Sequence, residues 1–211
     1  MQQCILFGTT NPRKFDDIRS IAAPLPVDLL APWALGLELL VEECGSQPEE
    51  NARIKAEAYC QAAKMPTVAL DSGLQVDGLP DNQQPGVHVR RVGGIQLSDE
   101  AMIEHYSRVF QSLGGQVGGL WITALAVVLP DGRRSGITIS HPTTFTAEAC
   151  EQRNPGNPLN SLQIDPQTGR YRAQEPLQAA DRNGSSGAFR TQVYRFFVEI
   201  LSMLQRTAPG G

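Results

Sequence analysis

The alternation of apolar and helical segments in the first half of the chain restricts its fold more than any other feature. Short apolar runs at residues 3–9, 27–31 and 67–70 predict strands, and helical periodicity at 13–22 and 48–64 predicts helices between them. Prolines and polar turns separate these segments. Alternation of this kind is typical of α/β folds.

A hairpin signal dominates the second half of the chain. The apolar run 120–129 is followed by the turn Pro130-Asp131-Gly132 and by a second run at 134–139, which predicts two antiparallel strands. We expect residues 143–149 to add a further strand to the same sheet. The remaining helical segments are 98–112 and 190–204. Together the two halves predict a mixed α/β fold with two lobes around a central cleft.

Composition excludes several classes of protein. The chain has 211 residues, of which 41% are hydrophobic and 19% charged, so it can bury a core and is not largely disordered. No stretch approaches the roughly 20 apolar residues of a membrane span, and nothing at the start reads as a signal peptide. A formal net charge of −4 argues against a general nucleic-acid binder. Four widely spaced cysteines favour reduced thiols and a cytoplasmic protein.

The segment Thr10-Asn11-Pro12-Arg13-Lys14 lies between a predicted strand and a predicted helix. Asn11 is a typical N-cap, and Pro12 suits the first helical position. Free N–H groups and the helix dipole at this point favour an anion, and Lys14 adds a positive charge. The segment is therefore a candidate phosphate site, with a polar turn and a surface lysine as the alternative.

Two carboxylates stand out among the acidic residues of the first half. Glu43 lies in a loop, and Asp71 follows a buried strand, where an acidic side chain needs a partner such as a metal ion. Mg²⁺ commonly binds one or two carboxylates together with water and phosphate oxygens. Glu49 and Glu50 are explained by their place in the first turn of a helix, where Ser46 and Glu49 fit a capping box. Glu43 and Asp71 are thus the metal-binding candidates.

Asn51 and Lys55 lie one turn apart on one face of the helix predicted at 48–64. If this face looks into the cleft, both side chains can reach a phosphate group. A solvated helix face is the alternative on spacing alone.

Four segments occur in an order and spacing that resemble the inosine/xanthosine triphosphate pyrophosphatase family. They are residues 10–14 (T-N-P-R-K), 41–56 (V-E-E-C-G-S-Q-P-E-E-N-A-R-I-K-A), 70–74 (L-D-S-G-L) and 85–94 (P-G-V-H-V-R-R-V-G-G). The ordered set is far more specific than any single motif. It covers residues 3–130 well and the remainder loosely.

The resemblance implies a Mg²⁺-dependent hydrolase, with Mn²⁺ as an alternative metal. Such an enzyme cleaves a nucleoside triphosphate between the α and β phosphates and releases the monophosphate and pyrophosphate. The implied substrates are deaminated purine nucleotides such as ITP, dITP and XTP. We also expect an elongated fold with a single domain over residues 1–206, a flexible tail at 207–211, and a homodimer without nucleic-acid or membrane partners.

By position, the resemblance assigns a role to each candidate residue. Asp71, Lys14 and Lys55 are the expected catalytic residues, and Glu43 and Asp71 are the expected metal ligands. The expected substrate-binding residues are Thr10, Asn11, Asn51, Ser72, Arg91, Asp165 and Arg190.

Three departures separate this chain from the family pattern. Leu70 replaces the first aspartate of an acidic pair. In the base-binding stretch at 161–166, Leu162 and Ile164 replace two aromatic residues, and a late Ser-His-Arg signature is reduced to Arg190. Stacking on an aromatic ring is worth roughly 1–3 kcal/mol per base, so we expect base affinity to fall by one to two powers of ten.

Two functions remain open on the sequence alone. The first is a nucleoside triphosphate pyrophosphatase with altered base recognition. The alternative is a non-catalytic nucleotide- or phosphate-binding homologue, which Leu70 and the altered base-binding stretch favour. Metal-dependent release of pyrophosphate distinguishes the two, and the sequence does not fix the base preference.

Overall fold

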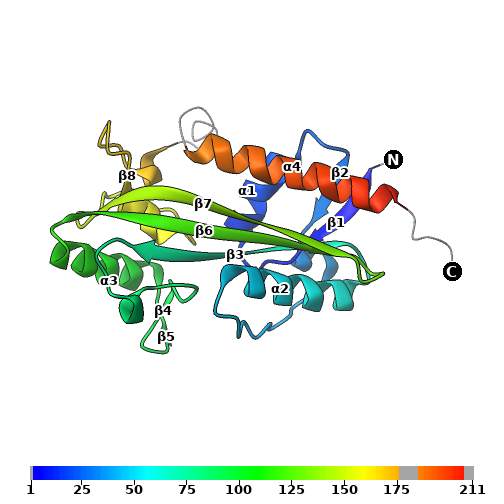
Figure 1. Cartoon of the computed structure of the whole chain (residues 1–211), viewed down its shortest axis with the longest axis horizontal. Coiled ribbons are helices and arrows are strands. Elements are labelled where there is room, and N and C mark those ends of the chain that lie inside the picture. Colours follow the sequence, from blue (N-terminus) through cyan, green and yellow to red (C-terminus); the bar gives the residue numbers. More distant parts are fainter. Residues whose placement is uncertain (1, 176–184, 207–211) are drawn as a thin grey trace. The chain divides into compact units, whose positions relative to one another are not determined.

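The chain is described by a computed structural model that covers residues 2–175 and 185–206 (Figure 1). It divides into two compact units. Unit 1 comprises Met1–Ser72, Thr123–Ile139 and Ala188–Gly211, and unit 2 comprises Gly73–Ile122 and Ser140–Gly187. The tail expected at residues 207–211 lies outside the described residues.

Three parallel strands begin unit 1. Strand β1 (Gln3–Phe7) pairs in parallel with β2 (Val27–Leu30) and with β3 (Thr67–Val76). Helix α1 (Pro12–Ala22) connects β1 to β2, and α2 (Pro48–Ala63) lies between β2 and β3, as parallel pairing requires. The strands and helices expected here are confirmed, except that β3 does not end at residue 70 but continues through Asp71 to Val76.

A hairpin supplies the antiparallel part of the sheet. Strands β6 (Gln116–Val128) and β7 (Arg134–Thr146) are joined by a short turn, in which the Leu129 N–H donates to the Arg133 carbonyl at 2.9 Å. So short a turn joins only antiparallel neighbours. With strand β8 (Gln163–Ile164) at its end, the sheet has the order β2-β1-β3-β6-β7-β8. The expected mixed α/β fold is therefore confirmed.

The separate strand expected at 143–149 is wrong, because β7 runs on through Pro142 to Thr146. Strand β8 pairs only with Thr144 and Phe145 of β7. Pro142 therefore occupies an edge position, where proline is tolerated because no ladder hydrogen bond is required there.

The two faces of the sheet in unit 1 carry different cores. On one face, Val68 and Leu70 of β3 pack with side chains of α1 and of α4 (Ser185–Gln205). On the other face, Ala69 of β3 packs with the alanines of α2. Because side chains alternate along a strand, Leu70 points to the α1 and α4 face and Asp71 points to the α2 face.

Unit 2 has its own core beneath α3 (Asp99–Ser112), whose N-cap is Ser98, as expected. Phe110 of this helix stacks on Phe145 with ring centroids 4.9 Å apart. The segment expected as a loop at 77–97 contains a small hairpin of β4 (Arg91–Val92) and β5 (Ile95–Gln96). Short 3₁₀ helices complete the described elements: η1 (Pro32–Leu35), η2 (Asp81–Gln83), η3 (Pro158–Ser161) and η4 (Arg172–Gln174).

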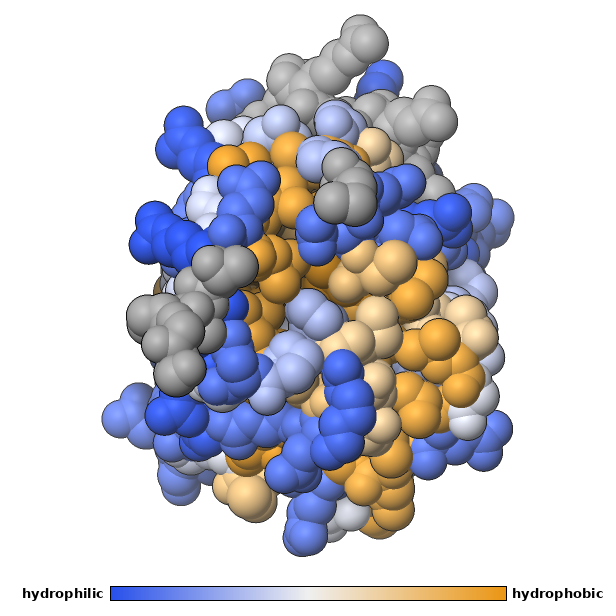
Figure 2. Space-filling model, turned by 90° about the vertical axis from the view of Figure 1, so that its right-hand side faces the viewer, coloured by the Kyte–Doolittle hydropathy of each residue, from blue (hydrophilic) through white to orange (hydrophobic). Residues whose placement is uncertain are grey.

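Apolar side chains also reach the surface. Figure 2 shows one face of the molecule, on which apolar residues gather between polar and charged ones. The large apolar side chains exposed in unit 1 are Trp33, Leu35, Leu40, Tyr194 and Val198. Within the described part of the chain, no helix combines the length and apolar character that crossing a membrane demands.

Gly8, between β1 and α1, makes a close backbone approach to α2. A Cβ at this position would lie 2.6 Å from Cδ2 of Tyr59, a side chain that is only 2% exposed and has little room to move. We expect Gly8→Ala to lower the free energy of unfolding by about 1–3 kcal/mol, measured by urea denaturation. Combining it with Tyr59→Ala should cost less than the sum of the two single changes, and an unchanged midpoint in Gly8→Ala would contradict the packing.

Candidate functional site

Lys55 connects the two carboxylates that were expected to bind metal. Its Nζ lies 2.7 Å from Oδ1 of Asp71 and 3.1 Å from Oε2 of Glu43. The Lys55 and Asp71 side chains are 12% and 9% exposed, whereas that of Glu43 is 42% exposed. Three residues from a loop, a helix and a strand of unit 1 therefore meet at one ionic cluster.

Asn51 forms hydrogen bonds with both the loop and the strand that contribute to this cluster. Its Nδ2 donates to Oδ2 of Asp71 at 3.3 Å, and its Oδ1 accepts from the N–H of Gly45 at 2.8 Å. Asn51 is 2% exposed, so its amide is held in place by packing as well as by these bonds. It ties the loop that carries Glu43 to the strand that carries Asp71.

The capping box expected from Ser46 and Glu49 is wrong by one residue, because the helix α2 is capped by Gln47 and Glu50. Gln47 is the N-cap, and Oε2 of Glu50 accepts from the N–H groups of Ser46 and Gln47 at 2.7 and 3.3 Å. These backbone hydrogen bonds lower the pKa of the Glu50 carboxyl. Glu49 instead accepts a hydrogen bond from Thr138 of β7 at 2.7 Å. Both residues thus have structural roles, as expected.

Asp71 lies within β3 and not at the end of a strand as expected. Its buried carboxylate nevertheless needs a charged or hydrogen-bonding partner, as the sequence predicted. A buried carboxylate is costly unless it is paired and hydrogen-bonded. Lys55 and Asn51 provide one interaction for each of its oxygens. The charge is therefore compensated within unit 1.

The donor set of this cluster fits a divalent metal ion. Glu43 and Asp71 each direct an oxygen to the same positively charged group, so they converge on one cation position. Two carboxylates are what Mg²⁺ commonly takes from a protein, the other ligands being water and phosphate oxygens. Among the described residues, no group of three or more His, Cys, Asp or Glu side chains is arranged to hold a metal.

Thr10 and Asn11 lie in the turn between β1 and α1, and Lys14 lies in the first turn of α1. Asn11 is the N-cap, and its Oδ1 accepts from the N–H groups of Arg13 and Lys14 at 2.9 and 3.3 Å. The expectation of free N–H groups here is wrong, because the cap itself uses them. An anion at this turn depends on the Thr10 hydroxyl, the Asn11 amide nitrogen, the Lys14 ammonium group and the helix dipole.

The strand register brings this turn toward Asp71. Leu6 lies opposite Thr67 and Phe7 opposite Val68, in parallel, and the Gly8 N–H donates to the Val68 carbonyl at 2.8 Å. β1 ends at Phe7, and the Thr9 N–H turns back to the Phe7 carbonyl at 2.9 Å, so the pairing with β3 stops before Thr10. The expected phosphate turn therefore begins next to β3, the strand that carries Asp71.

Two further residues of unit 1 have other contacts. The Ser72 hydroxyl lies 3.1 Å from that of Thr123 in β6. Arg190 of α4 donates to the hydroxyl of Ser20 at 3.1 Å. Ser20 is nine residues after Asn11, about 13 Å along α1, so this contact lies away from the phosphate turn.

Arg91 and Asp165 belong to unit 2. Arg91 is exposed in β4. Asp165 starts a turn, in which its Oδ1 accepts from the Gln167 N–H at 2.8 Å, and this hydrogen bond lowers the pKa of its carboxyl. The Asp165 side chain therefore has a structural role in its turn.

The stretch expected to bind the base is buried at Ser161 and Leu162, half-buried at residues 163–165 and exposed at Pro166. Leu162 is completely buried in the core of unit 2. Ile164 belongs to β8, where it pairs with Thr144. Neither side chain offers an exposed ring for stacking.

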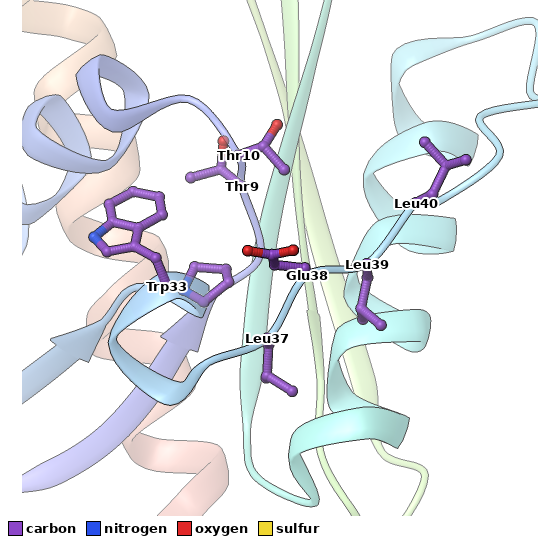
Figure 3. A pocket seen from close by; sticks show the side chains of 8 residues that line it. Thr9, Thr10, Trp33, Leu37, Glu38, Leu39 and Leu40 are labelled. Atoms are coloured by element: carbon purple, nitrogen blue, oxygen red, sulfur yellow. The ribbon is translucent and has the colours of Figure 1, made fainter.

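Sequence reasoning missed a cavity of about 350 Å³ in unit 1 (Figure 3). Thr9 and Thr10 line one side, and Trp33, Leu37, Glu38 and Leu39 line others. Part of the cavity wall comes from an apolar segment that contains several prolines. The prolines argue against a membrane span, but the segment has no periodicity that would predict a cavity. The cavity adjoins the turn expected to bind phosphate, since Thr10 belongs to both.

Comparison with known sequences gives consistent matches. A sequence model of the Ham1 family matches residues 5–141, more than half of the chain. The dITP/XTP pyrophosphatase of Leptospira interrogans is 39% identical over 100 residues, which are 47% of this chain and 50% of that protein. The dITP/XTP pyrophosphatase of Bacillus subtilis is 34% identical over 152 residues, which are 70% of this chain and 73% of that protein. The match thus spans only about half the length of the first of these relatives.

Solved structures share the fold. The Ham1 protein of Staphylococcus aureus superposes with a TM-score of 0.71 at 24% identity, covering 93% of this chain and 98% of that one. A HAM1 protein from Coxiella burnetii gives a TM-score of 0.76 at 20% identity, covering 93% and 99%. At these identities the likeness concerns the fold alone.

Proposed function

Because this chain belongs to the Ham1 family, we propose that it is a nucleoside-triphosphate pyrophosphatase that hydrolyses its substrate to the monophosphate and pyrophosphate. The observation that carries the proposal is the cluster of Glu43, Lys55 and Asp71, in which one lysine and two carboxylates meet on β3, the strand next to β1. Relatives named dITP/XTP pyrophosphatases support a deaminated purine nucleotide as the substrate.

In the proposed reaction, the oxygen of a water molecule attacks the α phosphorus, and the bond from that phosphorus to the bridging oxygen of the β phosphate breaks. Asp71 accepts the proton of the water and orients its lone pair. Asn51 holds the Asp71 carboxylate in position from its Oδ2 side. Lys55 and Lys14 neutralise charge that develops on the phosphate oxygens and on the leaving pyrophosphate.

Glu43 and Asp71 are the proposed ligands of Mg²⁺, for which Mn²⁺ can substitute. The bound ion would neutralise phosphate charge as a Lewis acid. Because Lys55 contacts the same two oxygens, an ion held there would take over these contacts, and the Lys55 ammonium group would be available to the phosphate oxygens. Thr10 and Asn11 then bind phosphate oxygens at the start of α1, and Ser72 contacts the phosphate or the sugar.

Base recognition is the part of the proposed function in which we expect this chain to depart from the family pattern. The stretch at 161–166 contains no aromatic residue. Its two aliphatic side chains are also committed elsewhere, since Leu162 is buried and Ile164 belongs to β8. We therefore propose altered base selectivity. We also propose a cytoplasmic location, a homodimer and roles in substrate binding for Arg91, Asp165 and Arg190, which the resemblance to the family supports and no contact described above does.

One panel assay tests the proposed function. Purified protein is incubated with canonical, deaminated and modified nucleoside triphosphates in Mg²⁺, Mn²⁺ or EDTA, and pyrophosphate and orthophosphate are quantified separately. We expect metal-dependent release of pyrophosphate from at least one nucleotide. Orthophosphate as the first product would contradict cleavage between the α and β phosphates, and turnover in EDTA would contradict metal dependence.

A second candidate function is a non-catalytic nucleotide-binding homologue. Leu70 favours it, because this side chain packs in the apolar core on the α1 face where a second carboxylate was expected. It predicts thermal stabilisation by nucleotide and metal without any turnover in the same panel.

A further inference from the structure

The two carboxylates proposed to bind metal already share a cation, which is the ammonium group of Lys55. Its Nζ lies 3.1 Å from Oε2 of Glu43 and 2.7 Å from Oδ1 of Asp71. A divalent ion and an ammonium group repel each other strongly at such distances, so the two cannot occupy this position together. Metal binding by these carboxylates is therefore an exchange of one cation for another.

The exchange is unfavourable as long as the ammonium group has no other anionic partner. The side chains of Lys55 and Asp71 are only 12% and 9% exposed, so water solvates them poorly. Breaking such a pair leaves an uncompensated charge, which is strongly destabilising. Among the described residues, the ion pairs of Lys55 are those with Glu43 and Asp71. A displaced ammonium group therefore needs an anion from a ligand.

The proposed phosphate turn begins against the helix that carries Lys55. Tyr59 lies one turn after Lys55 on α2, and a Cβ at Gly8 would lie 2.6 Å from Cδ2 of its ring. Gly8 comes directly before Thr9 and Thr10. The four-carbon stem of a lysine is flexible, so the ammonium group can turn from the carboxylates to a phosphate oxygen while the helix stays in place.

The two carboxylates, in contrast, are held by hydrogen bonds that do not involve the lysine. Asn51, which is 2% exposed, donates to Oδ2 of Asp71 at 3.3 Å. It also accepts from the Gly45 N–H at 2.8 Å and donates to the Gly45 carbonyl at 3.3 Å. A Cβ at Gly45 would lie 2.7 Å from Oδ1 of Asn51, so the loop that carries Glu43 lies directly on α2. The lysine is therefore the part of the cluster that can move.

We infer that Lys55 holds the cation position between Glu43 and Asp71 until a triphosphate binds, so that this protein takes up its divalent ion together with the triphosphate and not before it. The inference rests on the proposed function for the identity of the two ligands. It adds a regulatory role to Lys55: phosphates that accept its ammonium group also release the two carboxylates, which links the binding of one ligand to that of the other.

Mn²⁺ binding to the full chain without any nucleotide tests the inference. Electron paramagnetic resonance gives the Kd of Mn²⁺ for the wild type and for Lys55→Met, in which no ammonium group has to be displaced. We expect Lys55→Met to bind Mn²⁺ at least about tenfold more tightly than the wild type. Mn²⁺ should also raise the Tm of the variant more than that of the wild type.

Arg53→Met is the matched control for the loss of a positive charge. Arg53 lies on the same helix, but its partner is Glu57 and not a member of the cluster. We expect Arg53→Met to bind Mn²⁺ with wild-type affinity. An equal gain in Arg53→Met and Lys55→Met would show a general effect of charge and overturn the inference.

A measurement on the wild-type chain keeps the inference testable if Lys55→Met does not fold. The chain contains three lysines, Lys14, Lys55 and Lys64, so labelling of the lysine Cε with ¹³C gives three signals in a nuclear magnetic resonance spectrum. Lys55→Arg, which keeps the positive charge, assigns the signal of Lys55. We expect Mg²⁺ alone to leave this signal unchanged and Mg²⁺ with inorganic tripolyphosphate to shift it, while the Lys64 signal stays in place.

The outcomes separate the inference from the proposed function. Equal Mn²⁺ affinity in the wild type and Lys55→Met, or a Lys55 signal that moves with Mg²⁺ alone, would overturn the inference, and release of pyrophosphate from a nucleotide would still support the proposed function. Tighter Mn²⁺ binding by Lys55→Met, together with a wild-type protein that hydrolyses no nucleotide of the panel, would support the role of Lys55 and overturn the proposed function.

Discussion

Asp71→Asn should lower kcat for pyrophosphate release by at least about 100-fold, the lower end of what a general base contributes. The substitution keeps the shape of the side chain but removes the charge that accepts a proton and binds the metal ion. The Asn51 amide and the Lys55 ammonium group, which contact the two Asp71 oxygens, would face a neutral group. Steady-state kinetics with the best nucleotide of the panel measure the effect.

The matched control for this substitution is Asp28→Asn. Asp28 is also a strand carboxylate of unit 1, but it is exposed in β2, and we expect its variant to retain wild-type kinetics. Circular dichroism confirms that both variants are folded. If Asp71→Asn kept more than a tenth of wild-type kcat in a folded protein, Asp71 would not be the proton acceptor.

Lys55→Met should lower the free energy of unfolding by about 3 kcal/mol, because it leaves the carboxylate of Asp71 buried without its positive partner. The Lys55 ammonium group lies 2.7 Å from Asp71, and both side chains are nearly buried. Adding Asp71→Asn should recover most of the loss, since it removes the unpaired charge. Urea denaturation of the four proteins of this cycle gives the coupling between the two residues.

Arg53→Met is the matched control on the same helix. Arg53 pairs with Glu57 at 3.0 Å, but the two side chains are 47% and 38% exposed. Exposed pairs of this spacing contribute about 0.3–0.5 kcal/mol. A loss in Lys55→Met as small as that in Arg53→Met would contradict the buried ion pair.

The candidate site could be predicted from the sequence where local patterns decide its geometry. Helical spacing placed Asn51 and Lys55 on one face, and strand alternation places Asp71 on the face that this helix covers. That Lys55 lies between Glu43 and Asp71 could not be predicted, because it depends on the path of the loop that Asn51 ties to Asp71. The sequence therefore predicted the residues of the site but not that Lys55 pairs with both carboxylates.

Other features depend on competition between partners, which a sequence pattern does not show. Asn11 marks the start of α1, and its Oδ1 also accepts from the N–H groups that the sequence pattern assigns to an anion. The cavity beside Thr10 could not be predicted, because most of its walls come from a segment without periodicity. The contact of Trp33 with Phe15 of α1 joins residues far apart in the sequence. Fold elements with strong periodicity, such as α1 and α2, were placed within one or two residues.

Manganese binding tests the central claim, that Glu43 and Asp71 hold one cation together with the triphosphate. The number of bound Mn²⁺ ions is measured by electron paramagnetic resonance in the presence of a non-hydrolysable α,β-methylene analogue of inosine triphosphate. We expect one bound ion per wild-type chain. Glu43→Gln and Asp71→Asn should each weaken its binding, and the double variant should lose less than the sum of the two losses. Strictly additive losses, or full affinity after either substitution, would show that these carboxylates do not share an ion.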